Sequence, residues 1–296
     1  MLNSFAFFGA IETGFIYGLV ALGVFISFRI LDFPDLTVDG SFPLGAAVSA
    51  TMIVAGINPL IATFCACIAG AAAGLVTAWL NVRLKILHLL ASILTMIALY
   101  SINLRVMDGP NKALLGVETL LSPLDNLSIP YYIAYPIAFG IVILLVVAAL
   151  VWFLKTEVGL AMRATGSNER MAKANGINTG RMVLMGMALS NALVALAGAL
   201  FAQSQGSADV TMGVGVIVIG LASVIGGEAL LPKRTLLMWI SACILGSLLY
   251  RLVVAVALNG EVLGLKAQDL NLITAILVTV AIVAPNWRSY FKGSRA

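Results

Sequence analysis

Few side chains in this sequence have the type and spacing that catalysis or metal binding requires. His88 is the single histidine, which excludes a site with two histidine ligands and leaves any Ser-His-Asp triad dependent on a residue beside an apolar run. Cys65, Cys67 and Cys243 lie inside apolar runs without metal or redox spacing, so we expect them to be structural. There is no Gly-x-x-x-x-Gly-Lys-Ser/Thr phosphate loop. We therefore expect a chain that is not an enzyme and holds no cofactor and no metal.

Three carboxylates form the densest acidic group in the chain. Asp32, Asp35 and Asp39 fall within eight residues and follow Arg29 closely. One interpretation is a solvated turn between two helices. The other is a gate lined by these carboxylates, in which Arg29 pairs with Asp32. The residues alone leave both interpretations open.

Isolated ionisable residues within the apolar runs are rare. Ion-coupled carriers usually bind their ion on such residues inside the bilayer. Glu12 lies in the first turns of its run, where a wet interface accounts for it. Arg251 either extends its guanidinium to the outer surface or serves a pathway or a subunit interface. An ion-coupled secondary transporter of small solutes therefore stays the alternative function.

The elements that must position these residues follow from composition. The chain is 61% hydrophobic and 10% charged, whereas a soluble domain carries about 25% charged residues. The apolar residues fall in runs that are long enough for membrane helices. These runs cover roughly 5–28, 42–55, 60–82, 89–106, 131–154, 183–203, 210–225, 236–258 and 271–284. We predict an all-α polytopic bundle of about nine spans (eight to ten) in a lipid bilayer, with 1–296 as one domain and no nucleic-acid partner.

Two of these runs predict short or broken helices, near 40–56 and 205–227. The second region is rich in glycine, which indicates either close helix packing or a broken helix that lines a pathway. Asp35-Leu36-Thr37 precedes the first short helix and Asp209-Val210-Thr211 precedes the second, a weak internal echo. The pathway or gate candidates are Asp35, Thr37, Asp39, Gln203, Asp209, Gly213, Gly226, Gly227 and Arg251.

The distribution of Lys and Arg predicts the orientation in the membrane. They gather in 155–181, beside the third run, between the seventh and eighth runs and at the C-terminus. Basic residues favour the cytoplasmic side. We therefore expect the loop 155–182 and the C-terminus in the cytoplasm, the loops 108–130 and 259–269 outside, and the N-terminus outside. The expected location is a bacterial inner membrane.

The loop 155–182 carries helix signals of its own. Ser167 or Asn168 can cap a short helix, with Glu169 in its first turn and Gly176 just beyond its end. Asn178 or Thr179 can cap the next helix. An isolated helix this short is unstable in water, so it must pack on its own bundle or on a partner. An ordinary basic loop that happens to be helical is the alternative.

The residues of this loop resemble a known family motif. Gly159-Leu160, Arg163-Ala164, Gly166, Asn168-Glu169, Ala172 and Gly176-Ile177-Asn178 keep the spacing of the cytoplasmic coupling motif in the branched-chain amino acid and ribose permease family of ATP-binding-cassette importers. The resemblance implies that the ATPase subunit is contacted through Glu157, Gly159, Arg163, Ala164, Gly166, Asn168, Glu169, Met171, Ala172, Gly176 and Ile177. A bulky residue at Gly166 or Asn168 is then expected to abolish ATPase docking while the bundle stays folded.

The resemblance extends over nearly the whole chain. The stretch from Asp35 to Gly40 is similar to an early family motif, except that Asp39 replaces a small residue. Gly226-Gly227 resembles the pair that closes the seventh span, but Glu228 begins a departure from the family's glycine-rich run. The family implies a permease subunit paired with a second copy, two ATPase subunits and an extracytoplasmic binding protein or lipoprotein docked partly on 108–130. The nearest resemblance is to single-permease systems associated with aromatic amino acids.

Overall fold

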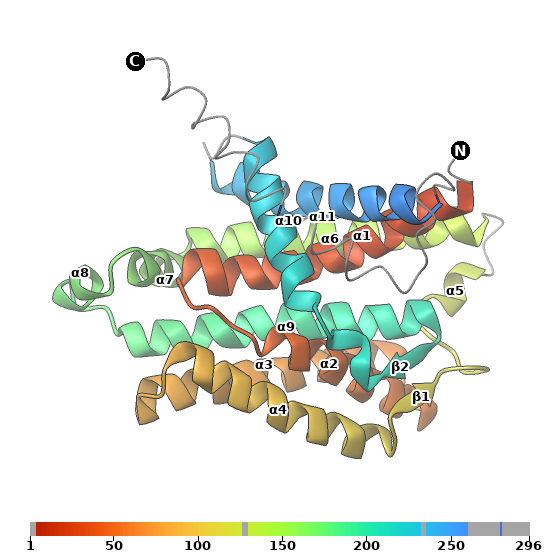
Figure 1. The fold of residues 1–296 in the computed structure, drawn as a ribbon, viewed down its shortest axis with the longest axis horizontal. Coiled ribbons are helices and arrows are strands. Elements are labelled where there is room, and N and C mark those ends of the chain that lie inside the picture. Colours follow the sequence, from red (N-terminus) through yellow and green to blue (C-terminus); the bar gives the residue numbers. More distant parts are fainter. Residues whose placement is uncertain (1–3, 126–129, 232–234, 260–278, 280–296) are drawn as a thin grey trace.

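Long helices packed side by side build the molecule, which is described here by a computed structural model (Figure 1). The structure describes residues 4–125, 130–231, 235–259 and 279. The long helices are α1 (Ser4–Val24), α3 (Pro59–Leu84), α4 (His88–Met107), α6 (Tyr131–Lys155), α9 (Thr179–Gln205) and α11 (Leu236–Asn259). A π-helical turn, Phe25–Ile30, extends α1.

Short elements gather at the two ends of this bundle (Figure 1). Helices α7 (Glu157–Ser167) and α8 (Glu169–Ala174) project at one end, which we call the α8 end. Strands β1 (Asn111–Ala113) and β2 (Ser207–Asp209) lie at the opposite end with α5 (Ser122–Asp125), and we call this the strand end. The two strands pair antiparallel, with Lys112 opposite Ala208.

The bundle has the length and surface of a membrane protein. Seven helices in the described residues are long and apolar enough to cross a bilayer. Large apolar side chains are exposed along α3 and α6, for example Phe64, Leu144 and Trp152. Such continuous apolar faces are rare on water-soluble monomers. The predicted all-α polytopic bundle is confirmed, with one small two-stranded sheet added.

The number of spans stays a prediction. Seven of the nine predicted runs coincide with the seven candidate spans. The second run forms α2 (Val38–Val54), which is apolar but shorter than those seven. The ninth run, 271–284, lies outside the described residues.

Two helices begin inside the bundle rather than at its ends. Residues 31–37 form neither helix nor strand before α2 starts. After β2, the 3-10 turn Val210–Gly213 precedes α10 (Val216–Leu230). The predicted short or broken helices near 40–56 and 205–227 are therefore present, and each follows a non-helical stretch that leads back into the bundle.

These two regions are related by an inverted repeat of topology. Helix α1 runs from the strand end to the α8 end, and α2 then returns toward the strand end (Figure 1). Helix α9 runs in the opposite direction to α1, and α10 returns toward the α8 end (Figure 1). In both repeats an aspartate Oδ1 accepts a hydrogen bond from the amide of the threonine two residues on, at 2.9 Å for Asp35 and 2.7 Å for Asp209. The weak echo in the sequence thus has the same local geometry in both halves.

Glycines allow the central helices to approach one another closely. A Cβ added at Gly198 of α9 would lie 1.9 Å from the carbonyl oxygen of Phe42, and one at Gly45 of α2 would lie 2.0 Å from that of Ala195. Both positions therefore bring the backbones of α2 and α9 into direct contact. The core consequently centres on α9, which packs against α1, α2 and α3.

Replacement of Gly198 by alanine should destabilise the bundle. Alanine gains about 1 kcal/mol of helix propensity over glycine, but the clash with a backbone oxygen forces α2 and α9 apart, at a cost of about 1–3 kcal/mol or more. The expected result is a lower midpoint temperature of thermal unfolding in detergent, measured by size-exclusion chromatography after heating. Gly9→Ala is the matched control, because nothing lies within 4 Å of its added Cβ. An unchanged midpoint for Gly198→Ala would contradict the close crossing.

Candidate functional site

A buried polar network joins three helices at the centre of the bundle. Asp35 Oδ2 accepts a hydrogen bond from Asn191 Nδ2 at 2.8 Å. The Ser41 hydroxyl donates to Asn191 Oδ1 at 2.7 Å. The hydroxyls of Thr37 and Thr77 lie 2.8 Å apart. All five residues are buried, so the network fixes the start of α2 against α3 and α9 and includes two of the pathway candidates, Asp35 and Thr37.

Asp39 connects the two broken helices. Its carboxylate accepts hydrogen bonds from the backbone amides of Gly215 at 3.2 Å and Ile217 at 2.8 Å. These amides lie at the start of α10. The first amides of a helix have no acceptor within the helix, and this end of the helix carries a partial positive charge. A Cβ at Gly213 would lie 2.0 Å from the carbonyl oxygen of Asp39, so this approach requires glycine. The residue that departs from the family motif therefore caps α10.

Gln203 and Asp209 lie at the strand end. Gln203 Nε2 donates to the hydroxyls of Ser49 at 3.1 Å and Thr63 at 2.9 Å, and its Oε1 accepts from the amide of Leu120 at 3.0 Å. Gln203 is buried, so it ties the connection after β1 to the bundle. Asp209 is partly exposed, and the hydroxyl hydrogen bond from Thr211 holds the pKa of its carboxyl below the ordinary value.

The paired glycines Gly226 and Gly227 have different surroundings. A Cβ at Gly227 would lie 1.9 Å from the carbonyl oxygen of Ala242, and one at Gly246 would lie 1.9 Å from that of Ser223. These two glycines let α10 and α11 cross in backbone contact. Among the described residues, nothing lies within 4 Å of a Cβ at Gly226, so close packing in this part of the chain explains Gly227 but not Gly226.

Arg29 pairs across the bundle with α10. The predicted pairing of Arg29 with Asp32 is wrong, because the π-helical turn places Arg29 against Glu228, with which it forms an ion pair. Glu228 also accepts a hydrogen bond from Trp239 Nε1 at 2.9 Å. Asp32 is exposed and has a left-handed backbone, with φ 53°. The departure at Glu228 therefore supplies the partner of Arg29.

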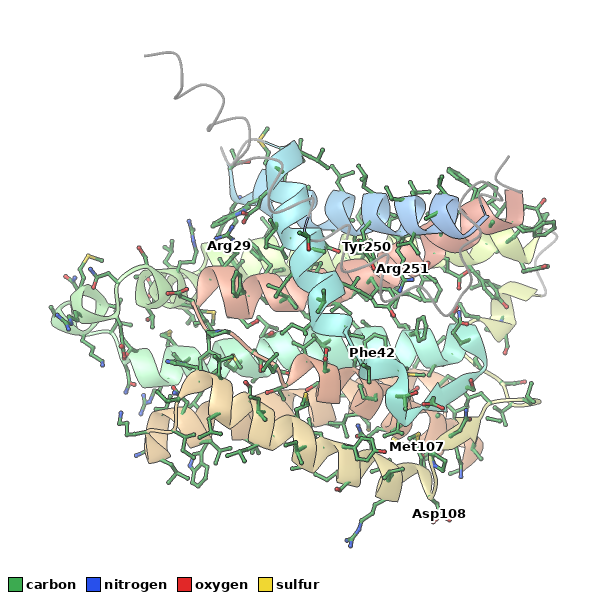
Figure 2. The ribbon with its side chains drawn as sticks, viewed as in Figure 1. Arg29, Phe42, Met107, Asp108, Tyr250 and Arg251 are labelled. Atoms are coloured by element: carbon green, nitrogen blue, oxygen red, sulfur yellow. The ribbon has the colours of Figure 1, made fainter. Side chains whose placement is uncertain are left out.

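Arg251 and Glu12 lie near the strand end of α11 and α1. The guanidinium carbon of Arg251 sits 3.8 Å from the centroid of the Tyr17 ring, and Figure 2 shows Arg251 between these helices. Its Nε is buried and makes no hydrogen bond within the described part of the chain. This inward packing favours a pathway or interface role over extension to the surface. Glu12 is partly buried and accepts a hydrogen bond from the Ser204 hydroxyl.

The projecting loop folds largely as its helix signals predict. Asn168 Oδ1 accepts from the amide of Met171 at 3.0 Å and begins α8. Gly176 has φ 80° just beyond its end, and Asn178 Oδ1 accepts from the amide of Arg181 at 3.1 Å to begin α9. The difference from the expectation is a second helix. Residues before Asn168 form α7, which Thr156 caps.

Several of the predicted coupling residues contact their own chain. A Cβ at Gly166 would lie 1.9 Å from the carbonyl oxygen of Ile30, and one at Gly159 would lie 2.4 Å from that of Phe153. Ala172 is fully buried, so it adds nothing to an exposed apolar surface. The expectation that a bulky residue at Gly166 leaves the bundle intact therefore needs revision, because it would displace α7 from the end of α1.

The other predicted coupling residues are either exposed or partly buried. Exposed residues are Glu157, Asn168, Glu169, Met171 and Gly176, while Arg163, Ala164 and Ile177 are partly buried. The Lys173 Nζ atom lies 2.7 Å from Glu169 Oε1, so the two side chains form an ion pair. The hydrogen bond from Lys173 is the main reason that the pKa of Glu169 lies below its ordinary value, so this carboxylate stays ionised at the start of α8.

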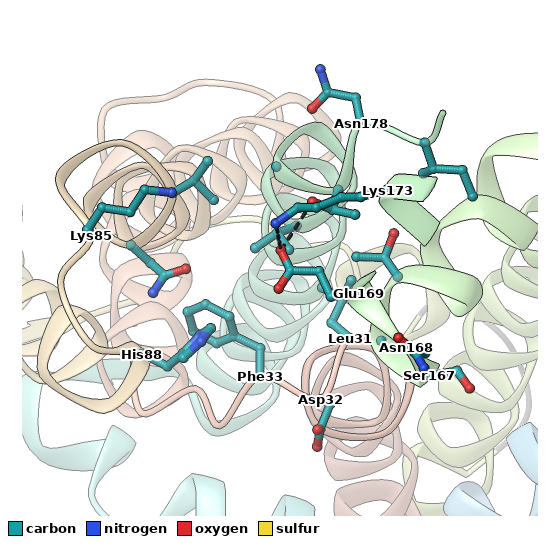
Figure 3. A pocket seen from close by; sticks show the side chains of 18 of the residues that line it. Leu31, Asp32, Phe33, Lys85, His88, Ser167, Asn168, Glu169, Lys173 and Asn178 are labelled. Carbon is teal, nitrogen blue, oxygen red and sulfur yellow. Dashed lines mark hydrogen bonds and ion pairs between the residues drawn. The ribbon is translucent and has the colours of Figure 1, made fainter. Parts of the chain in front are cut away.

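A cavity of about 840 Å³ lies between α8 and the main bundle (Figure 3). It is bordered by Asp32 and Phe33 after α1, by Lys85 and His88 between α3 and α4, and by Glu169 on α8. Among the described residues it carries charges of both signs. Helix α8 thus lies beside a hydrated recess at this end of the bundle.

Comparisons with known proteins agree with this architecture. Residues 6–283 match the family model for the permease component of the branched-chain amino acid transport system. The chain is 40% identical to a tyrosine transport system permease protein of Clostridioides difficile (strain R20291), over 95% of this chain and 92% of the relative. It is 26% identical to a ribose import permease protein of Escherichia coli (strain K12), over 85% and 77%. A solved structure of PsaBC from Streptococcus pneumoniae in complex with Fab shares the fold, with a TM-score of 0.51, 16% identity, and coverage of 93% and 89%.

The fold and these matches define a multi-pass membrane transport protein. The chain belongs to the family of branched-chain amino acid transport system permease components. It is a permease of an ATP-binding-cassette transport system and carries no catalytic function itself.

Several buried polar residues in and beside the central network are not among the site residues predicted from the sequence. Ser41, Thr77, Asn103 and Asn191 lie in apolar helices and are fully buried. A lone amide or hydroxyl within a membrane run is a recognisable signal, because it must find a partner inside the protein. What the sequence cannot supply is which partner it finds.

Loss of Asn191 should destabilise the centre of the bundle. Asn191→Leu removes the donor to Asp35 and the acceptor for Ser41, which leaves a buried carboxylate without its amide partner, at a cost of about 3–5 kcal/mol. We expect a strongly reduced yield of folded protein and a lower thermal midpoint.

The second arm of this test removes the charge as well. Asp35→Asn in the Asn191→Leu background should recover part of the loss, because a neutral amide tolerates burial better than an unpaired carboxylate. Equal loss in the single and double variants would contradict a coupled pair. Ser190→Ala is the control for losing one polar group, because it removes the 2.7 Å hydrogen bond from the Ser190 hydroxyl on α9 to the Gly23 carbonyl oxygen on α1.

Proposed function

We propose that the chain forms the translocation pathway of an importer that takes up an amino acid or a related small solute. In this proposal two permease copies pair as a homodimer, and two ATPase subunits bind α7 and α8 of each copy. An extracytoplasmic binding protein or lipoprotein delivers the solute at the strand end, partly on 108–130. The relative described as a tyrosine transport system permease supports an amino acid over a sugar, because its identity exceeds that of the ribose permeases.

The exposed surface of α7 and α8 is the observation that supports the proposed binding of the ATPase subunits. Leu160 and Met171 are 53% and 51% exposed, although both lie beyond the ends of the long apolar helices. Arg170 and Lys173 are exposed beside them. An apolar surface with a polar rim, on an element that projects from the bundle, fits a protein partner better than lipid.

The non-helical stretches before α2 and α10 support the proposed position of the translocation pathway. Backbone that is not helical inside a membrane protein needs partners or a hydrated cavity. Here Asp39 caps α10, while Asp35 and Asn191 fix the start of α2. Transporters with inverted repeats bind their solutes near such breaks. The proposed pathway runs beside these two starts and along the two-fold axis of the homodimer.

The proposed orientation follows from charge. Arg163, Arg170, Lys173 and Arg181 all lie at the α8 end, as do Arg83 and Lys85. Basic residues collect on the cytoplasmic side. We therefore place the α8 end in the cytoplasm and the strand end and N-terminus outside, in the inner membrane of a bacterium.

A negative charge introduced into the exposed apolar surface should separate the ATPase from the permease. Leu160→Glu and Met171→Glu should each reduce co-purification of the ATPase about tenfold or more, because a charge is buried in an apolar contact. Ile57→Glu is the control, since Ile57 is also exposed and apolar but lies between α2 and α3. Normal co-purification and normal stimulated ATP hydrolysis in both variants would sink the proposed docking surface. Thermal midpoints show that each variant is folded.

The ion-coupled carrier is tested with the permease alone. Reconstituted into liposomes without partners, the purified chain should accumulate no labelled tyrosine under a proton or sodium gradient, because its energy source is the ATPase. Uptake should appear when ATPase, binding protein and ATP are supplied. Accumulation driven by an ion gradient alone would establish the carrier instead.

A further inference from the structure

A second cavity, of about 440 Å³, opens between α2, α4 and the turn before α10. This volume is within the range of small-molecule sites. Asp39 and Asn103 contribute polar groups, and Met96, Ile97, Tyr100 and Val214 contribute much of the wall. Ile97 and Tyr100 are 58% and 51% exposed, so the cavity is reached from the face of α4.

Asn103 has an unused acceptor at this cavity. Its Nδ2 donates to the carbonyl oxygen of Gly40 at 3.2 Å. Its Oδ1 is buried and has no hydrogen-bond partner within the described residues. A buried carbonyl oxygen without a donor is destabilising, and such an orphan at a cavity wall is explained when a ligand supplies the donor.

Asp39 adds a negative charge to the same wall. Each of its two oxygens accepts one amide hydrogen bond from the α10 turn, but an ionised carboxylate has about four acceptor positions. No cationic side chain is among the described residues that line this cavity. The free acceptors therefore call for a ligand with a positively charged hydrogen-bond donor.

The rest of the wall restricts the body of that ligand. Most of the remaining wall is apolar and consists of Pro43, Met96, Ile97, Val210 and Val214. A molecule with hydroxyls on every side would therefore leave several of its hydroxyls without a hydrogen-bond partner. Unpaired buried hydroxyls cost about 1–3 kcal/mol each. An aliphatic or aromatic body, with its polar group at one end, suits this arrangement.

We propose that this cavity is a solute site of the permease, in which Asn103 Oδ1 and the Asp39 carboxylate bind the ammonium group of an amine-bearing solute and the apolar wall holds its side chain. The site rests on the proposed transport function and narrows its substrate class to primary amines with an apolar or aromatic body. Polyhydroxylated sugars are excluded by the same wall.

The direct test measures ligand protection of a single thiol. Ser101 is exposed and lines the cavity, so Ser101→Cys reports access to it when Cys65 and Cys67 are replaced by alanine and Cys243, which is buried, is replaced by serine. The permease–ATPase complex in lipid nanodiscs is labelled with a polar thiol reagent. Tyrosine and tyramine should slow labelling at least about threefold at millimolar concentration. 3-(4-Hydroxyphenyl)propionate, which lacks the amine, and ribose should not.

Variants of Asn103 assign the acceptor. Asn103→Leu in the same background should raise the half-protecting concentration of tyramine about tenfold, which corresponds to the loss of one hydrogen bond to a charged group. Asn103→Asp keeps the acceptor and should retain protection. Thr95→Val, on α4 outside the lining, is the matched control and should leave the value unchanged.

Two results would overturn the site. One is equal protection, or equal absence of protection, by tyramine and the propionate. The other is an unchanged half-protecting concentration in Asn103→Leu. ATPase co-purification and uptake with the binding protein, measured on the same complex, test the transport function separately, so the site can fail while the importer assignment stands. If Asn103→Leu does not fold, the comparison of ligands on the otherwise unaltered chain still decides.

Discussion

The hydrogen bonds from the Gly215 and Ile217 amides to Asp39 are the interaction on which the interior of this bundle depends. A helix that begins inside a membrane protein exposes amides that neither lipid nor an aliphatic neighbour can satisfy. Asp39 provides two acceptors and a charge that suits the positive end of α10. Because Asp39 itself lies in the first turn of α2, one side chain holds both broken helices in register. Gly213 is then required where the backbones meet.

Polar side chains elsewhere in the bundle also satisfy one another in small groups. Asp35, Asn191 and Ser41 satisfy one another across α2 and α9. Arg29, Glu228 and Trp239 do so between α1, α10 and α11. Each group lies where helices already approach closely through glycine, for example at Gly45 and Gly227. The short backbone distance and the polar contact therefore reinforce one another, and few ionisable side chains are needed to hold a largely apolar bundle.

Much of the architecture could be predicted from the sequence because run length and helix capping are local properties. The long helices, the short α2 and the caps at Asn168 and Asn178 all follow from neighbouring residues. Pairings across the bundle do not. The gate interpretation pairs Arg29 with nearby Asp32, whereas the structure pairs it with Glu228, which lies 199 residues away. Asp39 is a gate candidate and a departure from a motif in the sequence, but its role as the cap of α10 depends on where α10 begins. Likewise, the sequence does not reveal that Gly166 lies against the backbone of Ile30, which is far from it in the chain.

The contact between Gly166 and Ile30 has a mechanical consequence. It joins α7 to the π-helical turn at the end of α1 without an intervening side chain. In such a backbone-to-backbone contact no side chain lies between the two elements whose rotation could absorb a displacement. The chain leads from this turn to Asp35 in five residues. A displacement of α7 would therefore move this π-helical turn with it, and the turn leads directly to the anchor of α2.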